Sequence, residues 1–191
     1  MLLKNKVDFL EKNYAAIKGK IINKSILDIG APFENEFTVI GNFPYNISSQ
    51  ILFKILEWKA QVPYVIGMFQ KEVAQRVAAK AGKKDYGILS VLVQYYYDVK
   101  YLFDVPPGAF NPPPKVVSGV IQLTRREDNF AIASEKRFFT LVKMAFNQRR
   151  KMLRNAVKSL FEKEVLHDET FDKRAEQLSV EDFAKLTFKM N

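Results

Sequence analysis

The segment that most constrains this chain is residues 41–48, with the sequence Gly-Asn-Phe-Pro-Tyr-Asn-Ile-Ser. It follows a β-branched and aromatic run at residues 37–40, which predicts a buried strand. It precedes residues 48–58, whose apolar side chains recur at helical spacing. The segment is therefore predicted to be a strand-to-helix turn. In an open α/β sheet such a turn lies at the carboxyl end of a strand, where ligands bind.

The side chains of this turn suit a planar base that carries an exocyclic amine. The alternative is a plain turn of Asn, Pro and Gly in which Ser48 would be an ordinary helix N-cap, but a plain turn does not need the rings of Phe43 and Tyr45. Pro44 fixes its own backbone, so its carbonyl is held in one direction. The Asn42 side-chain oxygen and the Pro44 carbonyl are two acceptors for the two hydrogens of the amine, and Tyr45 can stack on the ring. Such a site acts by positioning and electrostatic stabilisation.

Four motifs carry a resemblance to a known family. Residues 42–45, Asn-Phe-Pro-Tyr, resemble the Asn-(Leu/Phe/Pro)-Pro-Tyr signature of amino-methyltransferases that use S-adenosylmethionine. Three further segments resemble one branch, the KsgA-type small-subunit rRNA adenine dimethyltransferases. They are Phe-Gln-Lys-Glu-Val-Ala-Gln-Arg at 69–76, Val-Pro-Pro-Gly-Ala-Phe-Asn-Pro-Pro-Pro-Lys-Val at 105–116, and Ala-Phe-Asn-Gln-Arg-Arg-Lys-Met-Leu-Arg-Asn at 145–155. The resemblance extends from Val7 to the C-terminus.

The resemblance implies a set of site residues. Asn42, Pro44, Tyr45 and Phe110 are the implied catalytic residues, with Phe110 packing against the flipped base opposite Tyr45. The alternative for Phe110 is a plug beneath its own proline-rich loop. S-adenosylmethionine is the implied cofactor, and Asn42 and Ser25 are its implied binding residues. Ser25 aligns with a family acid that lies near the adenine of the cofactor.

The chain departs from the family before the turn. Family members begin with a strand, a Gly-rich loop that wraps the cofactor, and a helix, and nothing in this chain matches them. Leu-Asp-Ile-Gly at 27–30 starts like such a loop, but Pro32 follows and the further glycines are absent. We therefore expect an α/β protein with a partial Rossmann-like class I methyltransferase sheet, which lacks the family's N-terminal cofactor-loop segment.

Hydrophobic periodicity and turn residues predict the remaining elements. The predicted helices cover residues 4–14, 48–58, 70–80, 87–95 and 180–189. The predicted strands cover residues 20–23, 37–40, 62–69, 98–105 and 115–123. Only a short loop separates the last two strands, so we expect them to be antiparallel.

Composition bounds the partners of the chain. Its 30 basic and 21 acidic residues give a net charge of +9, which favours nucleic acid or an anionic membrane surface. The absence of cysteine excludes disulfides and thiolate metal sites, and it fits a reducing compartment. No apolar run reaches membrane-spanning length, and the single histidine, His167, lies in a polar stretch. We expect a cytoplasmic protein with no membrane and no metal.

The C-terminal third is where we expect RNA to bind. Residues 136–158 contain eight basic and no acidic residues, and they are predicted to form one helix with an apolar stripe and a basic stripe. One-sided charge over this length favours a surface that tracks phosphates. The polar residues 125–129 predict a boundary between an α/β domain, 1–126, and a helical RNA-binding domain, 127–191. The predicted RNA-binding residues are Lys115, Lys143, Asn147, Arg149, Arg150, Lys151, Arg154 and Lys158.

By this resemblance the function is rRNA methylation in ribosome biogenesis. Methyl groups pass from S-adenosylmethionine to the exocyclic amine of adenines in small-subunit rRNA, and each base must leave its stack to reach the turn. Two alternatives stay open. One is a non-catalytic RNA-binding or ribosome-assembly factor that has lost the cofactor loop, and the other is a DNA adenine methyltransferase.

Overall fold

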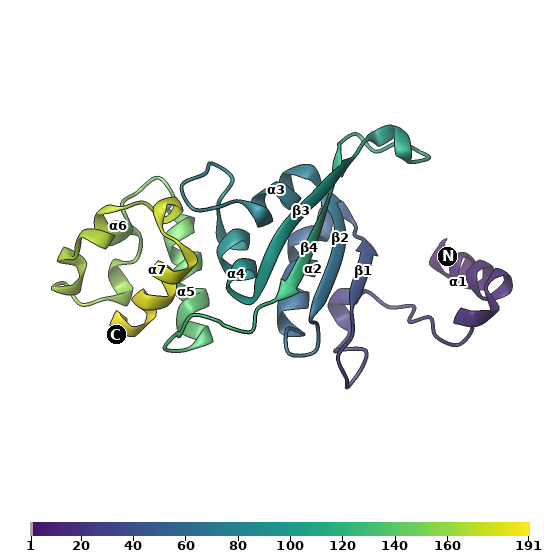
Figure 1. The fold of residues 1–191 in the computed structure, drawn as a ribbon, viewed down its shortest axis with the longest axis horizontal. Helices are drawn as coiled ribbons and strands as arrows, with labels where there is room; N and C mark the ends of the chain where they lie inside the picture. Colours follow the sequence, from purple (N-terminus) through teal and green to yellow (C-terminus); the bar gives the residue numbers. More distant parts are fainter. Residues whose placement is uncertain (1) are drawn as a thin grey trace. The chain divides into compact units, whose positions relative to one another are not determined.

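The computed structural model describes residues 2–191 and divides the chain into two compact units, Met1–Glu34 and Asn35–Asn191. The first unit contains the helix α1 (Leu2–Asn13) and two 3-10 turns, at Ala15–Ile17 and Ile26–Asp28 (Figure 1). The prediction of a strand at residues 20–23 is wrong. The backbone N–H of Lys24 donates to the Ile22 carbonyl at 3.0 Å, so the chain bends where a strand would need to extend.

The second unit is built on a four-stranded sheet in the order β1-β2-β4-β3. The strands are β1 (Val39–Asn42), β2 (Tyr64–Gln70), β3 (Tyr97–Val105) and β4 (Ser118–Arg125). β1 and β2 are parallel, whereas β4 pairs antiparallel with both β2 and β3. The predicted α/β class and the predicted antiparallel pairing of the last two strands are confirmed.

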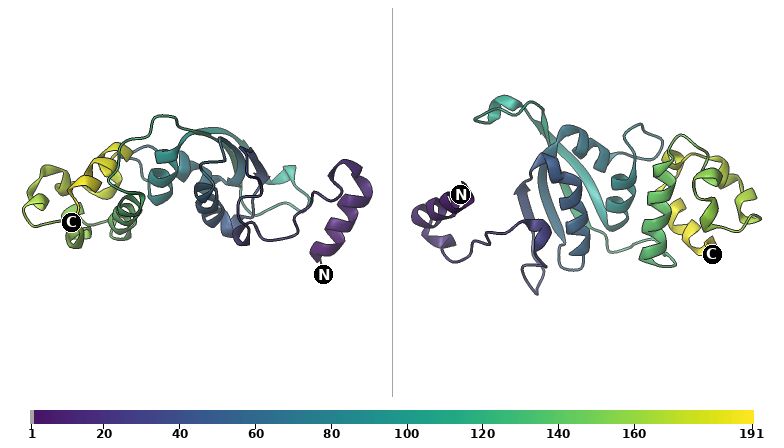
Figure 2. Two further views of the ribbon diagram at one scale, coloured as in Figure 1. Left: turned by 90° about the horizontal axis from the view of Figure 1, so that it is seen from below. Right: turned by 180° about the vertical axis from the view of Figure 1, so that it is seen from behind.

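Helices cover one face of the sheet (Figure 2). They are α2 (Ser48–Glu57), α3 (Lys71–Ala78) and α4 (Ile88–Tyr96). In α2 the buried residues recur at helical spacing, as predicted, and they pack into the core: Ile51, Leu52, Ile55 and Leu56. The opposite face, turned toward the viewer in Figure 1, carries exposed Ile40 and Ile66. The prediction that residues 37–40 form a buried strand is wrong, because β1 is an edge strand and Ile40 is 72% exposed.

A cluster of helices follows the sheet. Its α-helices are α5 (Glu135–Asn147), α6 (Leu153–Ala156) and α7 (Val180–Leu186), and 3-10 turns join them. Ser134 caps α5, and Ser179 caps α7 with Asp182 in a reciprocal capping box. The cluster packs on α4, where the rings of Tyr95 and Phe138 lie 4.6 Å apart. The predicted boundary at 126/127 falls between β4 and α5, inside the second compact unit, and it stays a prediction.

The prediction of one continuous helix over residues 136–158 is wrong. The helix α5 ends at Asn147, and the Lys151 N–H donates to the Gln148 carbonyl at 2.8 Å to close a tight turn. The backbone of Leu153 then bonds to the Lys173 carbonyl instead of continuing the helix. A continued helix would also bring the like charges of residues 150 and 154 into contact.

Candidate functional site

The Asn-Phe-Pro-Tyr segment forms the turn that the sequence predicts. Asn42 is the last residue of β1, and the 3-10 turn Tyr45–Ile47 leads directly into α2. The Phe43 N–H donates to the Met68 carbonyl at 3.1 Å, which extends the pairing with β2 by one residue. The turn therefore lies at the carboxyl end of a parallel strand, where open α/β sheets bind their ligands.

Two glycines create the space for the ring of Phe43. Gly41 of β1 and Gly67 of β2 are register partners. A Cβ at either position would lie 2.9 Å from the Phe43 ring. The ring is buried and stacks on Phe69, with 5.1 Å between the ring centroids. Phe43 thus anchors the turn in the core, whereas Asn42 on the other side of the strand is exposed.

The structure distinguishes the carbonyls of the turn. The Pro44 carbonyl accepts from the Ile47 N–H and the Ser48 hydroxyl, each at 3.3 Å, so the turn itself uses it. Within residues 2–191, neither the Phe43 carbonyl nor the Asn42 side chain takes part in a hydrogen bond. Two unoccupied acceptors therefore stand next to each other at the end of β1. The sequence does not reveal the Phe43 carbonyl, because the choice of capped carbonyl depends on the backbone geometry.

The hydroxyl of Tyr45 is held by a residue that the sequence reading missed. It forms a hydrogen bond with the hydroxyl of Ser118, the first residue of β4. Ser118 is fully buried, and Tyr45 is half-buried. A serine that interrupts the apolar run at 116–123 was the available signal. This bond ties the Asn-Phe-Pro-Tyr turn to a strand 73 residues further along the chain.

A groove of about 370 Å³ lies beside the turn, lined by residues 70–72, 75, 116 and 117. Its Lys71 ammonium forms an ion pair with Asp104 at 2.5 Å, and the Tyr101 hydroxyl donates to the same carboxylate. The hydrogen bonds from Lys71 and Tyr101 lower the pKa of Asp104. The wall of the groove is therefore fixed by a charged network between α3 and β3.

The structure does not bring every predicted site residue together. Phe110 follows the 3-10 turn Pro107–Ala109, in a loop that stands out from the end of the sheet (Figure 1). Among the residues described, no ring contact joins Phe110 and Tyr45, so their pairing stays a prediction. Lys115 is exposed in the same loop. Ser25 lies in the first unit, where its hydroxyl accepts from the Leu27 N–H at 3.2 Å.

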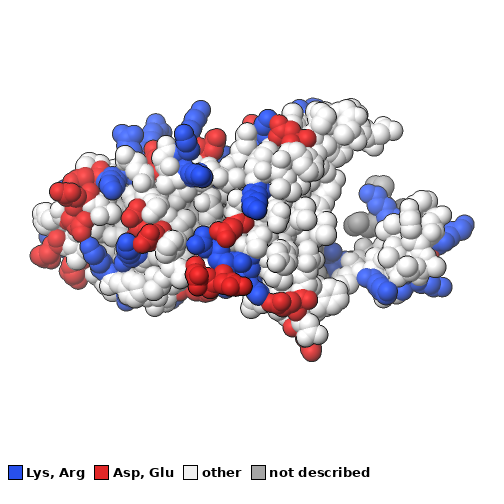
Figure 3. All heavy atoms as spheres, viewed as in Figure 1, with Lys and Arg blue, Asp and Glu red and all other residues white. Residues whose placement is uncertain are grey.

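Most of the predicted RNA-binding residues gather in two hollows of the helical cluster. Asn147, Arg149, Arg150 and Lys151 line a hollow of about 470 Å³ together with Gln148. A second hollow, of about 600 Å³, is lined by residues that include Arg154, Lys158, Lys163 and His167. Lys163 and His167 were not predicted to take part. In Figure 3 basic side chains project together from the upper edge of this cluster.

Two of these cations are engaged within the protein. Arg149 pairs with Glu176 at 3.3 Å and also donates to the Lys84 carbonyl, while Arg154 pairs with Asp172. By contrast, the cations at positions 150, 151 and 158 are exposed and form no ion pair within residues 2–191. The Lys143 ammonium lies over the Phe53 ring, 5.9 Å from its centroid. Among the predicted RNA-binding cations that line the two hollows, those at 150, 151 and 158 are thus free to meet phosphate.

Comparison with known proteins identifies the family. The family model described as "Ribosomal RNA adenine dimethylase" matches residues 3–190. This chain belongs to the ribosomal RNA adenine dimethylase family. One relative is the ribosomal RNA small subunit methyltransferase A of Flavobacterium johnsoniae, 54% identical over 188 residues. That match covers 96% of this chain and 72% of the relative. The protein of the same name from Cytophaga hutchinsonii is 52% identical over 184 residues, covering 95% of this chain and 71% of the relative.

Solved structures place this dimethylase family member in the same fold. The crystal structure of a dimethyladenosine transferase from Plasmodium falciparum superposes with a TM-score of 0.73 and 27% identity, covering 84% of this chain and 68% of that one. The 23S rRNA methyltransferase ErmE superposes with a TM-score of 0.67 at 18% identity, covering 96% of this chain and 78% of that one. The second likeness concerns the fold alone. Both confirm the predicted Rossmann-like methyltransferase sheet.

None of the helices in residues 2–191 is long and apolar enough to cross a membrane. In the same part of the chain, no group of three or more His, Cys, Asp or Glu side chains is arranged to hold a metal ion.

Proposed function

We propose that this chain methylates the exocyclic amine of adenines in small-subunit rRNA, as a step of ribosome biogenesis. Membership of the dimethylase family supports the reaction, and the names of the Flavobacterium and Cytophaga relatives support the small ribosomal subunit as substrate. The observation that carries the proposal is the pair of unoccupied acceptors at the carboxyl end of β1, the Asn42 amide oxygen and the Phe43 carbonyl. With this substrate, we expect the protein to act in the cytoplasm, where small ribosomal subunits are assembled.

The two acceptors address the chemical difficulty of the reaction. The lone pair of an adenine amine is conjugated with the ring and is a poor nucleophile. Asn42 and the Phe43 carbonyl accept its two hydrogens and favour a tetrahedral nitrogen, which frees the lone pair. Pro44, with φ of −59°, fixes the backbone that follows the Phe43 carbonyl. Tyr45 stacks on the flipped base, and Phe110 packs against the opposite face of that base.

S-adenosylmethionine is the proposed methyl donor. When bound, it supplies an electrophilic methyl group on a sulfonium. Asn42 is placed to contact it at the carboxyl end of β1, because its side chain is exposed and makes no hydrogen bond with the described residues. The Ser25 hydroxyl is the proposed contact for the cofactor adenine. It accepts from the Leu27 N–H and so keeps its own proton for donation to a ring nitrogen.

Residues 127–191 are the proposed RNA-binding domain. The exposed cations Arg150, Lys151 and Lys158 contact phosphates, with Lys143 and Asn147 on the adjoining end of α5. Lys115 adds a contact from the loop before β4. Arg149 and Arg154 support this surface through their ion pairs with Glu176 and Asp172. Because the contacts are to phosphate, affinity falls steeply with salt.

Methyl transfer from labelled S-adenosylmethionine to unmethylated small ribosomal subunits tests the proposal. The wild-type chain is compared with Asn42→Ala and with the matched control Asn46→Ala, an exposed asparagine of the same turn. We expect label on adenine with the wild type and the control, and none with Asn42→Ala, which still binds subunits.

The same assay separates the alternatives. Subunits that bind the wild-type chain but acquire no label would reject catalysis and favour a ribosome-assembly factor. Label on duplex DNA at matched salt, with none on subunits, would favour a DNA methyltransferase. Normal transfer by Asn42→Ala would reject the assignment of the turn.

A further inference from the structure

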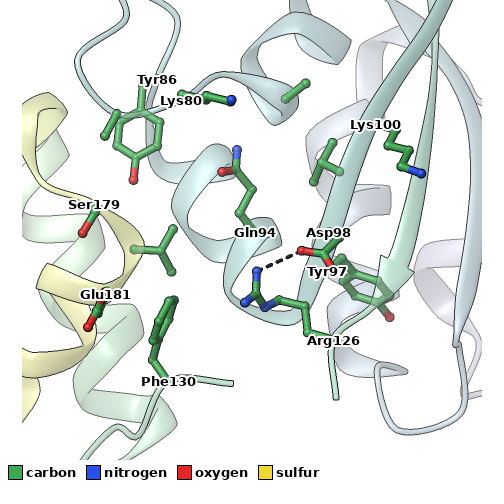
Figure 4. Close-up of a pocket in the computed structure, with 14 residues that line it drawn as sticks. Lys80, Tyr86, Gln94, Tyr97, Asp98, Lys100, Arg126, Phe130, Ser179 and Glu181 are labelled. Carbon is green, nitrogen blue, oxygen red and sulfur yellow. Dashed lines mark hydrogen bonds and ion pairs between the residues drawn. The ribbon is translucent and has the colours of Figure 1, made fainter. Parts of the chain in front are cut away.

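A cleft of about 440 Å³ lies at the end of β3 away from the catalytic turn (Figure 4). The first residues of β3, Tyr97 to Lys100, line it, whereas the last residue, Val105, pairs with the Ser118 that holds Tyr45. The other walls come from the end of α3, from α4, from the connection after β4 and from the start of α7. This cleft plays no part in the site described above.

Two buried donors that line the cleft have no hydrogen-bond partner. They are the hydroxyl of Tyr86, whose side chain is 1% exposed, and the Nε of Arg126. Figure 4 shows the Tyr86 hydroxyl pointing into the space between α4 and α7. Buried polar groups in native proteins are nearly always paired, so each exception calls for an unseen partner. Of the four such atoms in the described residues, these two line the same cleft, which favours a ligand rich in acceptors at this place.

The position of Arg126 is fixed independently of a ligand. Its NH1 donates to Asp98 at 2.9 Å, and its guanidinium carbon lies 5.5 Å from the centroid of the Phe130 ring. These contacts hold the guanidinium plane and leave Nε without a protein acceptor. A guanidinium held in this way matches the oxygens of a phosphate.

The remaining polar groups of the cleft do not compete for this role. The Gln94 amide donates to the Val77 and Ala79 carbonyls at 2.7 and 2.8 Å, which uses both of its hydrogens. The Glu181 carboxylate is paired with Lys185 at 2.8 Å, and Asp98 is paired with Arg126. Lys80 lines the cleft and forms no ion pair within residues 2–191.

The Tyr86 hydroxyl acts here as a donor. Burial, together with the nearby Asp182 carboxylate, raises the pKa of Tyr86 above its ordinary value. The phenol therefore keeps its proton at neutral pH. The cleft groups without a partner among the described residues then include the Tyr86 hydroxyl, the Arg126 Nε and the ammonium groups of Lys80 and Lys100. All of these are donors, and three of the four side chains are cationic.

We propose that this cleft binds a phosphate group, and that in the substrate it is a backbone phosphate of the rRNA. The RNA part of this inference rests on the proposed function. The loop at 82–85 connects the cleft to the hollow lined by residues 147–151. The loop follows Lys80, and its Lys84 carbonyl accepts a hydrogen bond from Arg149. Its Gly82 N–H also donates to the Glu176 carbonyl at 2.7 Å, which fixes the loop on the helical cluster.

The variant Tyr86→Phe tests the site, because it removes one unpaired hydroxyl and keeps the ring. We expect its thermal midpoint without ligand to equal or exceed that of the wild type. Its affinity for a single-stranded RNA of about 12 nucleotides, measured by fluorescence anisotropy, should fall about tenfold. Lys80→Met should lower the slope of log affinity against log salt by about one. Lys54→Met, which removes a charge from α2, is the control and should leave the slope unchanged.

Titration with adenosine monophosphate in a calorimeter distinguishes the two sources of phosphate. If Tyr86→Phe weakens the nucleotide but not the RNA, the cleft takes a free nucleotide and the assignment to rRNA is overturned. If neither ligand is weakened, or if the thermal midpoint of Tyr86→Phe falls, the phosphate site is overturned. These readouts measure binding alone, so they stand even where the chain transfers no methyl group and the proposed reaction fails.

Discussion

Removing the hydroxyl of Tyr45 and removing the hydroxyl of Ser118 both break the hydrogen bond between them, but the two changes should lower the free energy of unfolding by different amounts. Tyr45→Phe leaves the Ser118 hydroxyl without a partner at a fully buried position. A stranded buried hydroxyl costs about 1–3 kcal/mol, so we expect a loss of about 2 kcal/mol in the free energy of unfolding. Ser118→Ala instead frees the hydroxyl of half-buried Tyr45, which can reach water. We expect that variant to lose only about 1 kcal/mol.

The double variant completes the cycle. Replacing both partners removes the stranded hydroxyl, so Tyr45→Phe with Ser118→Ala should cost about 1 kcal/mol, less than the sum of the single variants by about 2 kcal/mol. Urea denaturation measures all four free energies. Ser159→Ala, at an exposed serine, is the control and should change the free energy by less than about 0.5 kcal/mol. An additive double variant, or a greater loss for Ser118→Ala than for Tyr45→Phe, would refute the reasoning.

Three further outcomes are expected. Gly67→Ala should destabilise the chain by about 1–3 kcal/mol and reduce methyl transfer, because its Cβ would lie 2.5 Å from the Phe69 ring and 2.9 Å from the Phe43 ring. In the same assays Gly108→Ala, whose Cβ meets nothing within 4 Å, should do neither. Burial raises the pKa of Tyr97 to about 12. The contribution of its hydroxyl to the free energy of unfolding is therefore complete below about pH 10 and is lost between about pH 10 and 12. The difference in urea midpoint between wild type and Tyr97→Phe should therefore shrink over that range, and a constant difference would contradict it. Lys158→Met should weaken binding to RNA of any sequence equally and lower the slope of log affinity against log salt by about one. Weaker binding to some sequences only would argue against a phosphate contact.

Local patterns were sufficient for most of the elements. The spacing of Ile51, Leu52, Ile55 and Leu56 predicted α2, and the run that begins at Val62 predicted β2. These signals lie within a few residues, so they reflect the period of a helix or strand directly. The sequence around residues 42–45 predicted a strand-to-helix turn for the same reason, and the structure confirms that turn between β1 and α2.

Features that depend on distant residues escaped the sequence reading. The bond between Tyr45 and Ser118 joins segments 73 residues apart, and no periodicity links them. The end of α5 depends on the bond from Leu153 to Lys173, which lies well outside any helical window. Exposure of Ile40 follows from its place on the edge strand β1, whereas a β-branched run by itself indicates burial.

The order of the strands has a consequence for how the chain acquires its structure. β4 is the last strand to be synthesised, yet it lies between β2 and β3 in the sheet. During translation the edge of β2 therefore stays open until residue 125 has emerged, and the pairing that closes it is non-local and intrinsically slow. The hydroxyl that holds Tyr45 arrives on that same strand. Pairing of β4 with β2 therefore also brings the Ser118 hydroxyl to Tyr45, so completion of the sheet and anchoring of the Asn-Phe-Pro-Tyr turn depend on the same strand.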